Sequence, residues 1–425
     1  RWNASGTIAR WRRQLADAYH GLGDLVARRL HAERALAVAG HEVDLSRGAK
    51  ALAVARLLSR RLWGRRGPPP EPDGTPAPSG ESSVLDVAKA YRHMVELAYF
   101  DHDGLGMVWG ALRAIDAAER TTPSADLSFA YAQLGGTMGL ARIHPLVRHF
   151  VRRAVRSAQA AGAAHAEGYA HMIDALYQVG LGKWEPALRS AARCQELGRR
   201  TRDHVTWGYA EVVRFWTHYY RDDKVEARQS VEVLRAEARR TEHQQHAAWA
   251  LRCEALLDAR CGSLAAAAAR LQDARSLLSD TKDAAELIMV HGALGLARFE
   301  LKDRDAAVES AMLALHLGHR AGRPTNHATF TGIVAALQVL FELCMREPDK
   351  PVWREATTKG IDILRRYRSV FPIVEPSYRY WRGRMLLLNG ARRIAAGNWR
   401  RGLASARALG MPVEERQLHE VLKNR

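Results

Sequence analysis

The sequence predicts an all-α fold, an α-solenoid of antiparallel helix pairs stacked side by side. Three observations support this prediction. Amphipathic runs with apolar residues three or four positions apart fill most of the chain, which is typical of helices with one buried face. Short turns recur between these runs at a regular spacing of about 40 residues, and such a fixed period is typical of repeat proteins. No segment shows the alternation of β-branched residues that favours a strand.

Residues 1–66 are expected to form helices of the repeat type, followed by one basic amphipathic helix. A turn at Gly23-Asp24 separates the first two helical runs. Residues 49–63 then form the basic helix, on which one side carries Leu52, Ala55, Leu58 and Leu62.

Residues 67–83 interrupt the helical pattern. This segment contains six prolines and three glycines. Proline lacks a backbone N–H and fixes φ, so neither a helix nor a sheet is expected here. We predict a flexible linker or exposed loop, and a polyproline ligand is the alternative.

Residues 84–425 are expected to form the main helical-repeat solenoid. Turns at Gly182, Asp222, Gly262 and Lys302 are evenly spaced, one period apart, and weaker turns near Asp103 and Arg142 continue the spacing. A small residue follows about five positions after each clear turn, where two helices must approach closely: Ala187, Ala227, Ala267, Ala307 and, after the turn at Gly390, Ala395.

One period shows how two helices arise from this pattern. Between residues 205 and 240, apolar residues recur at helical spacing, stop at Asp222-Asp223, and then begin again. Short acidic side chains bond to the local backbone and favour turns, so two helices joined by a tight turn are expected. A single such pair cannot bury its apolar face, and stacking on its neighbours supplies the core.

Composition excludes several classes of protein. The 425 residues are 47% hydrophobic and 26% charged, as in globular proteins rather than disordered chains. Four widely spaced cysteines exclude a disulfide scaffold and favour a cytoplasmic location, and no apolar run is long enough to span a membrane. The chain begins at Arg1 without a signal-peptide pattern, so we expect a piece of a longer protein.

The net charge of +18 is concentrated at the two ends of the chain. Residues 1–66 carry +9 and residues 350–425 carry +11, whereas the residues between them carry −2. Basic ends are typical of proteins that bind an acidic domain or nucleic acid. A GC-rich genome also favours arginine codons, so charge alone does not decide between these explanations.

Two segments resemble tetratricopeptide repeats. One runs from Leu15 to Leu36 through the turn at Gly23-Asp24, and the other runs from Ala175 to Leu188. The resemblance implies a right-handed superhelix in which the first helix of each pair lines an inner groove. The period in this chain is longer than the 34 residues usual in that family, which implies longer helices or connections.

Further strings resemble the C-terminal helical region of bacterial multidomain signalling proteins. These proteins carry a nucleotide cyclase or protein kinase followed by an AAA or STAND-type ATPase. The strings are His218–Arg221, Gln245–Leu251, Val370–Ile373, Trp381–Gly383 and Ala408–Pro412. No Walker A, cyclase or kinase motif is present in this chain, so the resemblance implies that any catalytic domains precede Arg1.

No motif in the sequence predicts a catalytic or metal site. The histidine pairs His243/His246 and His316/His319 lack the further ligands that zinc needs, and surface or helix-end positions are the expectation. The cysteines are isolated in apolar helical contexts and are expected to be buried. We therefore expect no cofactor, no metal and no enzymatic activity in this segment.

Aromatic and arginine side chains are the best candidates for binding a partner, because these residue types dominate interaction hot spots. The tetratricopeptide register places eight of them near the inner groove: Tyr209, Trp216, Tyr219, Trp249, Arg252, Arg260, Tyr380 and Arg384. The alternative is that these aromatic residues simply pack between helices.

These observations favour a non-catalytic protein-interaction and regulatory scaffold. Its partner is expected to be a protein or peptide, including upstream domains of the same polypeptide. One alternative is nucleic-acid binding through the basic ends, where Arg379–Arg382 places two aromatic residues beside arginines. The other is a small-molecule effector held inside the superhelix.

Overall fold

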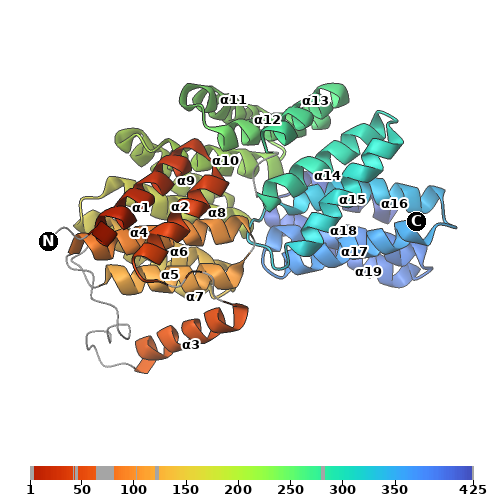
Figure 1. The fold of residues 1–425 in the computed structure, drawn as a ribbon. Helices are drawn as coiled ribbons and strands as arrows, with labels where there is room; N and C mark the ends of the chain where they lie inside the picture. The colour runs from red at the N-terminus through yellow and green to blue at the C-terminus, as the bar shows by residue number, and fades with distance from the viewer. Residues whose placement is uncertain are drawn as a thin grey trace. The chain divides into compact units, whose positions relative to one another are not determined.

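The structure, a computed structural model, describes residues 4–41, 43, 46–63, 81–101, 103–119, 124–278 and 283–423. All regular structure in these ranges is helical (Figure 1). In chain order the helices are α1 (Ala4–Leu22), α2 (Leu25–Val38), α3 (Arg47–Trp63), α4 (Glu81–Phe100), α5 (Gly104–Ala118), α6 (Ala125–Leu140), α7 (His144–Ala160), α8 (Ala164–Gly180), α9 (Trp184–Thr201), α10 (His204–Tyr220), α11 (Lys224–Thr241), α12 (Gln244–Arg260), α13 (Leu264–Leu277), α14 (Ala284–Glu300), α15 (Arg304–Arg320), α16 (Phe330–Arg346), α17 (Pro351–Arg368), the 3₁₀ turn η1 (Pro372–Val374), α18 (Glu375–Leu388), α19 (Arg392–Leu409) and α20 (Pro412–Lys423).

The chain forms two compact units, one of residues 1–174 and 193–207 and the other of residues 175–192 and 208–425. In both units consecutive helices pack against each other across short turns, for example α1 on α2, α6 on α7, α12 on α13 and α14 on α15. Helices two positions apart also touch, as α4 does with α6 and α14 with α16, so the pairs stack in chain order. The prediction of an all-α solenoid is confirmed.

Left-handed turn residues confirm the period and divide it in half. Residues with positive φ occur at even intervals of half a period from 142 to 262, once after each helix, and again at 302 and 322. They are Arg142, Gly162, Gly182, Arg202, Asp222, Glu242, Gly262, Lys302 and Gly322. Each full period between residues 142 and 262 therefore holds two helices, and each of these helices is followed by a residue whose backbone reverses the chain.

The small residues after the turns lie where helices approach closely, as predicted. Ala187, Ala227, Ala267, Ala307 and Ala395 are all fully buried. Ala267 illustrates the reason, since it belongs to a core shared by α12, α13 and α14 that includes Ala255, Leu271 and Leu294. A larger side chain at such a position would push the helices apart.

The period predicted between residues 205 and 240 forms α10 and α11 with a turn over residues 221–223. Asp223 caps α11, because its carboxylate accepts a hydrogen bond from the backbone N–H of Glu226 at 3.3 Å. The acidic pair therefore ends one helix and begins the next, as the sequence indicated.

The basic helix predicted over residues 49–63 is α3, which packs on α5. Leu57 is buried, whereas Leu52 and Leu58, on the side that the sequence predicted to be apolar, are exposed. The segment predicted to be a linker lies outside the described residues as far as residue 80, and α4 begins at Glu81. None of the helices in the described ranges has the length and apolar character needed to cross a membrane.

Candidate functional site

Six of the eight residues predicted to bind a partner lie together on α10 and α12. We term them the α10–α12 cluster: Tyr209, Trp216 and Tyr219 on α10, and Trp249, Arg252 and Arg260 on α12. The two helices occupy equivalent positions in successive repeats, so residues one period apart in the sequence take similar places in the stack.

Two of the aromatic rings on α10 in this cluster contact side chains near the middle of α12. The rings of Tyr209 and Trp249 meet edge to face, with 4.9 Å between their centroids. The guanidinium of Arg252 lies 5.0 Å from the centre of the Trp216 ring. These contacts are aromatic and cation–π interactions, which fix the orientation of the rings.

Arg252 is buried and pairs with an acidic residue of the next repeat. It is 1% exposed, and its Nε donates a hydrogen bond to Glu286 on α14. Burial raises the pKa of Glu286, and burial together with the Glu286 carboxylate raises the pKa of Asp283 to about 7. Asp283 is held by Gln245, whose Nε2 donates to Oδ2 at 3.0 Å. The pair therefore ties α12 to α14 through a charged contact in the interior.

Arg260 links the cluster to the C-terminal helix. Its guanidinium lies 3.4 Å from the centre of the Tyr219 ring, and its Nη1 donates to the backbone carbonyl of Tyr219 at 2.6 Å. It also pairs with Asp222 at 3.6 Å, and Asp222 in turn pairs with Arg416 on α20 at 2.8 Å. The same turn region therefore holds Tyr219 and anchors α20.

The remaining two predicted residues, Tyr380 and Arg384, form a separate pair on α18. Arg384 Nη1 donates to the hydroxyl of Tyr380 at 2.9 Å, and the guanidinium lies 4.5 Å from the centre of the Phe341 ring. The ring of Tyr380 packs edge-on against Trp381. The aromatic residues of Arg379–Arg382 thus contact neighbouring side chains of their own unit.

The eight residues differ in how far they are buried. Three of them, Trp216, Trp249 and Arg252, are at most 5% exposed. These three side chains therefore pack between helices, as the alternative interpretation of the sequence expected of the aromatic residues. Tyr209, Tyr219, Arg260, Tyr380 and Arg384 are half-buried, and each has a face accessible to solvent. Only this second group can touch a partner without movement of the helices.

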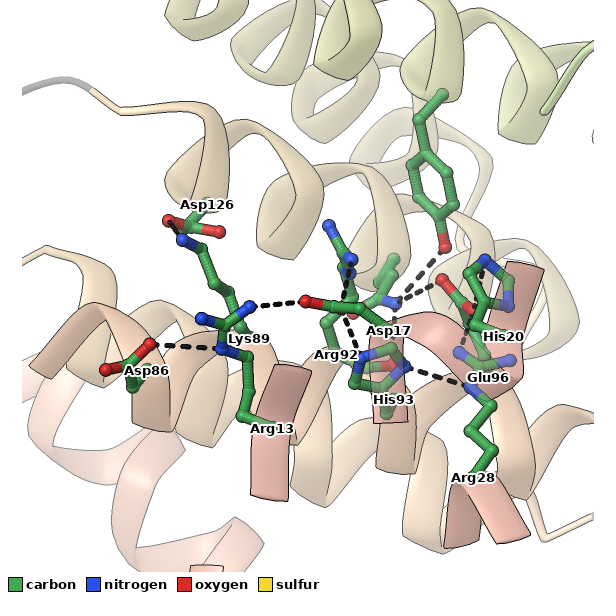
Figure 2. A network of polar contacts seen from close by, with 12 residues as sticks. Arg13, Asp17, His20, Arg28, Asp86, Lys89, Arg92, His93, Glu96 and Asp126 are labelled. Carbon is green, nitrogen blue, oxygen red and sulfur yellow. Dashed lines mark hydrogen bonds and ion pairs between the residues drawn. The ribbon is translucent and has the colours of Figure 1, made fainter. Parts of the chain in front are cut away.

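A buried network of charged side chains in the first unit was not predicted from the sequence (Figure 2). We term it the α4 network, because α4 supplies half of the residues labelled in the figure. They are Asp86, Lys89, Arg92, His93 and Glu96 on α4, Arg13, Asp17 and His20 on α1, Arg28 on α2, and Asp126 on α6. The network attaches the first helix pair to the rest of the unit.

One end of the α4 network is organised by Arg13. Its Nε donates to Oδ1 of Asp86 at 3.0 Å, and its Nη1 pairs with Asp17 one helical turn away on α1. Arg92 approaches the same Asp17 carboxylate at 3.5 Å. Although burial opposes ionisation, the hydrogen bond from His93 and the nearby cations hold the pKa of Asp17 well below its ordinary value.

The centre of the network is His93, which is fully buried. Its Nε2 lies 2.8 Å from Oδ1 of Asp17, and its Nδ1 lies 2.9 Å from Nε of Arg28. Burial and the positive charge of Arg28 lower the pKa of His93 to about 4. Arg28 also pairs with Glu96, and its charge keeps the pKa of that carboxyl low despite burial. The histidine is therefore neutral among charged neighbours at ordinary pH.

A sequence signal for this network exists on α4. Asp86, Lys89, His93 and Glu96 are three or four positions apart, so they share one face of the helix. A charged stripe is usually a solvated face, and the partners of Asp86 and His93 on α1 and α2 are far away in the sequence. Such long-range pairing leaves no local pattern.

The histidine pairs and cysteines occupy structural positions. His243 is the N-cap of α12, where its Nδ1 accepts from the N–H of His246, and both rings are buried. His316 and His319 are exposed on α15. Three cysteines are buried as predicted, whereas Cys261 is exposed because it lies in the turn after α12. Within the described ranges, no group of three or more His, Cys, Asp or Glu side chains is arranged to hold a metal ion.

Comparisons with known proteins give distant structural likenesses. No protein-family model and no curated protein matches the sequence. The chain is similar to the crystal structure of yeast Tom70, with a TM-score of 0.42 and 12% identity over 98% of this chain and 81% of that one. It is also similar to a Pyrococcus horikoshii STAND protein with a tetratricopeptide repeat sensor, with a TM-score of 0.44 and 12% identity. That match covers 98% of this chain and 65% of the other.

Proposed function

We propose that this chain is a non-catalytic protein-interaction and regulatory scaffold that works in the cytoplasm. The observation that carries the proposal is the set of half-buried aromatic and arginine side chains held rigidly on the helices of a solenoid. Stacked helix pairs present extended surfaces to other proteins, and pre-oriented aromatic and arginine side chains bind with little loss of conformational entropy.

The residues proposed to contact the partner are Tyr209, Tyr219, Arg260, Tyr380 and Arg384. Trp216, Trp249 and Arg252 have a supporting role, because they are buried and lie under or beside the accessible side chains. Tyr209 rests on Trp249, and Tyr219 packs edge-on against Trp216 as well as against the guanidinium of Arg260. This packing holds the solvent-accessible edges of Tyr209 and Tyr219 in one orientation.

The proposal includes a larger parent protein, a signalling ATPase or nucleotide cyclase in which this chain is the sensor or docking region. The strings around His218, Trp249 and Trp381 that resemble such proteins support it. In that arrangement the scaffold binds a partner and biases the activity of the nucleotide-binding domains.

The test measures binding and regulation in the polypeptide that contains this chain. Tyr209→Ala, Tyr219→Ala and Tyr380→Ala are each expected to weaken partner binding by roughly tenfold or more, the cost typical of a hot-spot residue. Leu387→Ala, which alters an exposed side chain on α18, is the control and is expected to leave binding unchanged. Unchanged affinity in all three tyrosine variants would remove the support for this site.

A second candidate function is a sensor for a small polar effector, and the interior of the second unit favours it. Three side chains that lie near Trp216 each carry a buried polar atom with no hydrogen-bond partner among the described residues: Arg252 Nη1, Tyr220 Oη and His327 Nδ1. The rings of Tyr220 and His327 lie 5.3 and 6.4 Å from that of Trp216. Buried polar groups of this kind are usually satisfied by hydrogen bonds. An increase in melting temperature with a small anionic or hydroxylated compound would support this function over the scaffold alone.

A further inference from the structure

The first helix pair carries a continuous apolar stripe on its outer face. On α1 the stripe follows alternating steps of three and four residues, through Ile8, Trp11, Leu15, Ala18 and Leu22. On α2 it continues through Val26 and Leu30. The six large side chains among these are between 41% and 58% exposed. Strict three-four spacing is that of the a and d positions of a coiled coil, which pack against a partner helix.

The inner face of the same helix pair carries charged side chains that are already paired within the unit. It meets α4 through Arg13, Asp17 and Arg28, the charged side chains of the α4 network (Figure 2). The inner face thus combines these charged side chains with buried apolar ones such as Ala16 and Leu36, whereas the outer stripe is apolar and exposed. In a solenoid, a terminal pair that faces water carries a polar outer face, because an exposed apolar face would associate with other molecules.

The charges beside the stripe indicate the chemistry of what covers it. If the stripe occupies the a and d positions, the charged residues at the flanking e and g positions of α1 and α2 are Arg12, Arg29 and Arg34, and all are basic. Arg29 is already paired with Asp101 of this chain, so Arg12 and Arg34 are the flanking charges offered to a partner. Arg34 is exposed, and Arg12 is half-buried beside His31. Charges at these positions select the partner in helix pairing, so acidic flanks fit this face. A second copy of this chain would set arginine against arginine.

We propose that the outer face of α1 and α2 is a docking surface for an amphipathic helix pair with acidic flanks, stacked on the solenoid as a further repeat. The occupant has apolar residues at the same three-four spacing and Glu or Asp at the positions facing Arg12 and Arg34. This inference rests on the proposed scaffold function and gives one partner class for it, through a surface separate from Tyr209, Tyr219 and Tyr380.

The experiment titrates the whole chain against two dye-labelled helical peptides, each of about three heptads with leucine at a and d. One peptide carries Glu at every e and g position, and the other carries Lys there, so neither pairs with itself. Fluorescence anisotropy is expected to show the acidic peptide binding about tenfold or more tightly than the basic one. Trp11→Glu is expected to weaken binding of the acidic peptide by a similar factor.

Controls separate this inference from the proposed function. Val225→Glu, a change at an exposed apolar residue of α11, is expected to leave peptide binding unchanged, as is Tyr380→Ala. Equal binding of the two peptides, or no effect of Trp11→Glu, would overturn this inference. Neither result would contradict the proposed scaffold function. Dimerisation of the chain that Trp11→Glu abolishes would also overturn the inference, because the occupant would then be a second copy.

Discussion

Arg28 donates a hydrogen bond from Nε to Nδ1 of His93 at 2.9 Å, in the interior between α2 and α4. A guanidinium can only donate, so this nitrogen of the imidazole must be an acceptor and the proton must reside on Nε2, which donates to Asp17. A second proton on His93 would remove the acceptor and place two cations in contact. The attachment of the first helix pair therefore requires a neutral histidine.

This arrangement makes the stability of the first unit dependent on pH. The pKa of His93 is about 4 in the folded protein, against about 6.5 in an unfolded chain. As pH falls from 6.5 to 4, the unfolded state takes up the proton first, so the free energy of unfolding decreases, by on the order of 3 kcal/mol from this residue. His20, whose pKa is also lowered by burial and by Arg28, adds to the loss in the same direction.

The measurement is urea unfolding at several pH values between 7 and 4, with His93→Gln beside the original chain. We expect the variant to be less stable at pH 7 but to lose less stability on acidification. His319→Gln, a change at an exposed residue of α15, is the control. Parallel pH profiles for the original chain and His93→Gln would contradict this prediction.

The buried pair of Arg252 and Glu286 gives a second prediction. Arg252→Leu leaves a carboxyl group without its cation in the interior, so we expect a loss of roughly 3 kcal/mol of stability, reduced to the extent that Glu286 takes up a proton. In Arg252→Leu combined with Glu286→Leu neither charge of the pair is left, and most of the loss should be recovered. A double-mutant cycle by urea unfolding checks this, and additive losses would show that the two side chains do not depend on each other.

A close backbone approach between α14 and α16 in the second unit gives a third prediction. A Cβ placed on Gly292 would lie 2.0 Å from the carbonyl oxygen of Gly332, so Gly292→Ala must force the two helices apart. We expect a loss of roughly 3 kcal/mol by thermal or urea unfolding. Gly397→Ala on α19, where a Cβ meets nothing within 4 Å, is the matched control and should add roughly 0.5–1 kcal/mol.

The sequence predicted the local features of the fold well, because turns and close contacts leave local signals. Gly182 and Gly262 indicate turns because glycine readily adopts a left-handed backbone. Ala227 indicates a close contact between helices because its side chain is small. The alternate turns at Arg202 and Glu242 were not recognised, because neither residue is of a type that usually adopts a left-handed backbone. The full period and its two helices were therefore predicted, whereas the positions of these alternate turns were not.

The burial of the candidate site residues was harder to predict, because it depends on which helices pack against each other. The repeat pattern places Trp216 and Arg252 on the first helices of their pairs, but only the contacts with Glu286 and His327 show that both are enclosed. The α4 network was missed for a related reason. A face with Asp86 and His93 is typical of a solvated surface unless its partners, far away in the sequence, are known.

Lys302 provides a final prediction from the left-handed turns. It has a φ of 69°, and it occupies the place that glycine fills at residues 182 and 262. A side chain in this region costs roughly 1 kcal/mol, so Lys302→Gly is expected to stabilise the protein by about that amount, less the entropy that glycine adds to the unfolded chain. Asp222→Gly relieves the same strain but removes the ion pairs with Arg260 and Arg416, so its gain should be smaller or absent. Melting temperatures of the two variants, measured together, separate backbone strain from side-chain pairing, and an equal effect of both would show that the ion pairs at Asp222 contribute no stability.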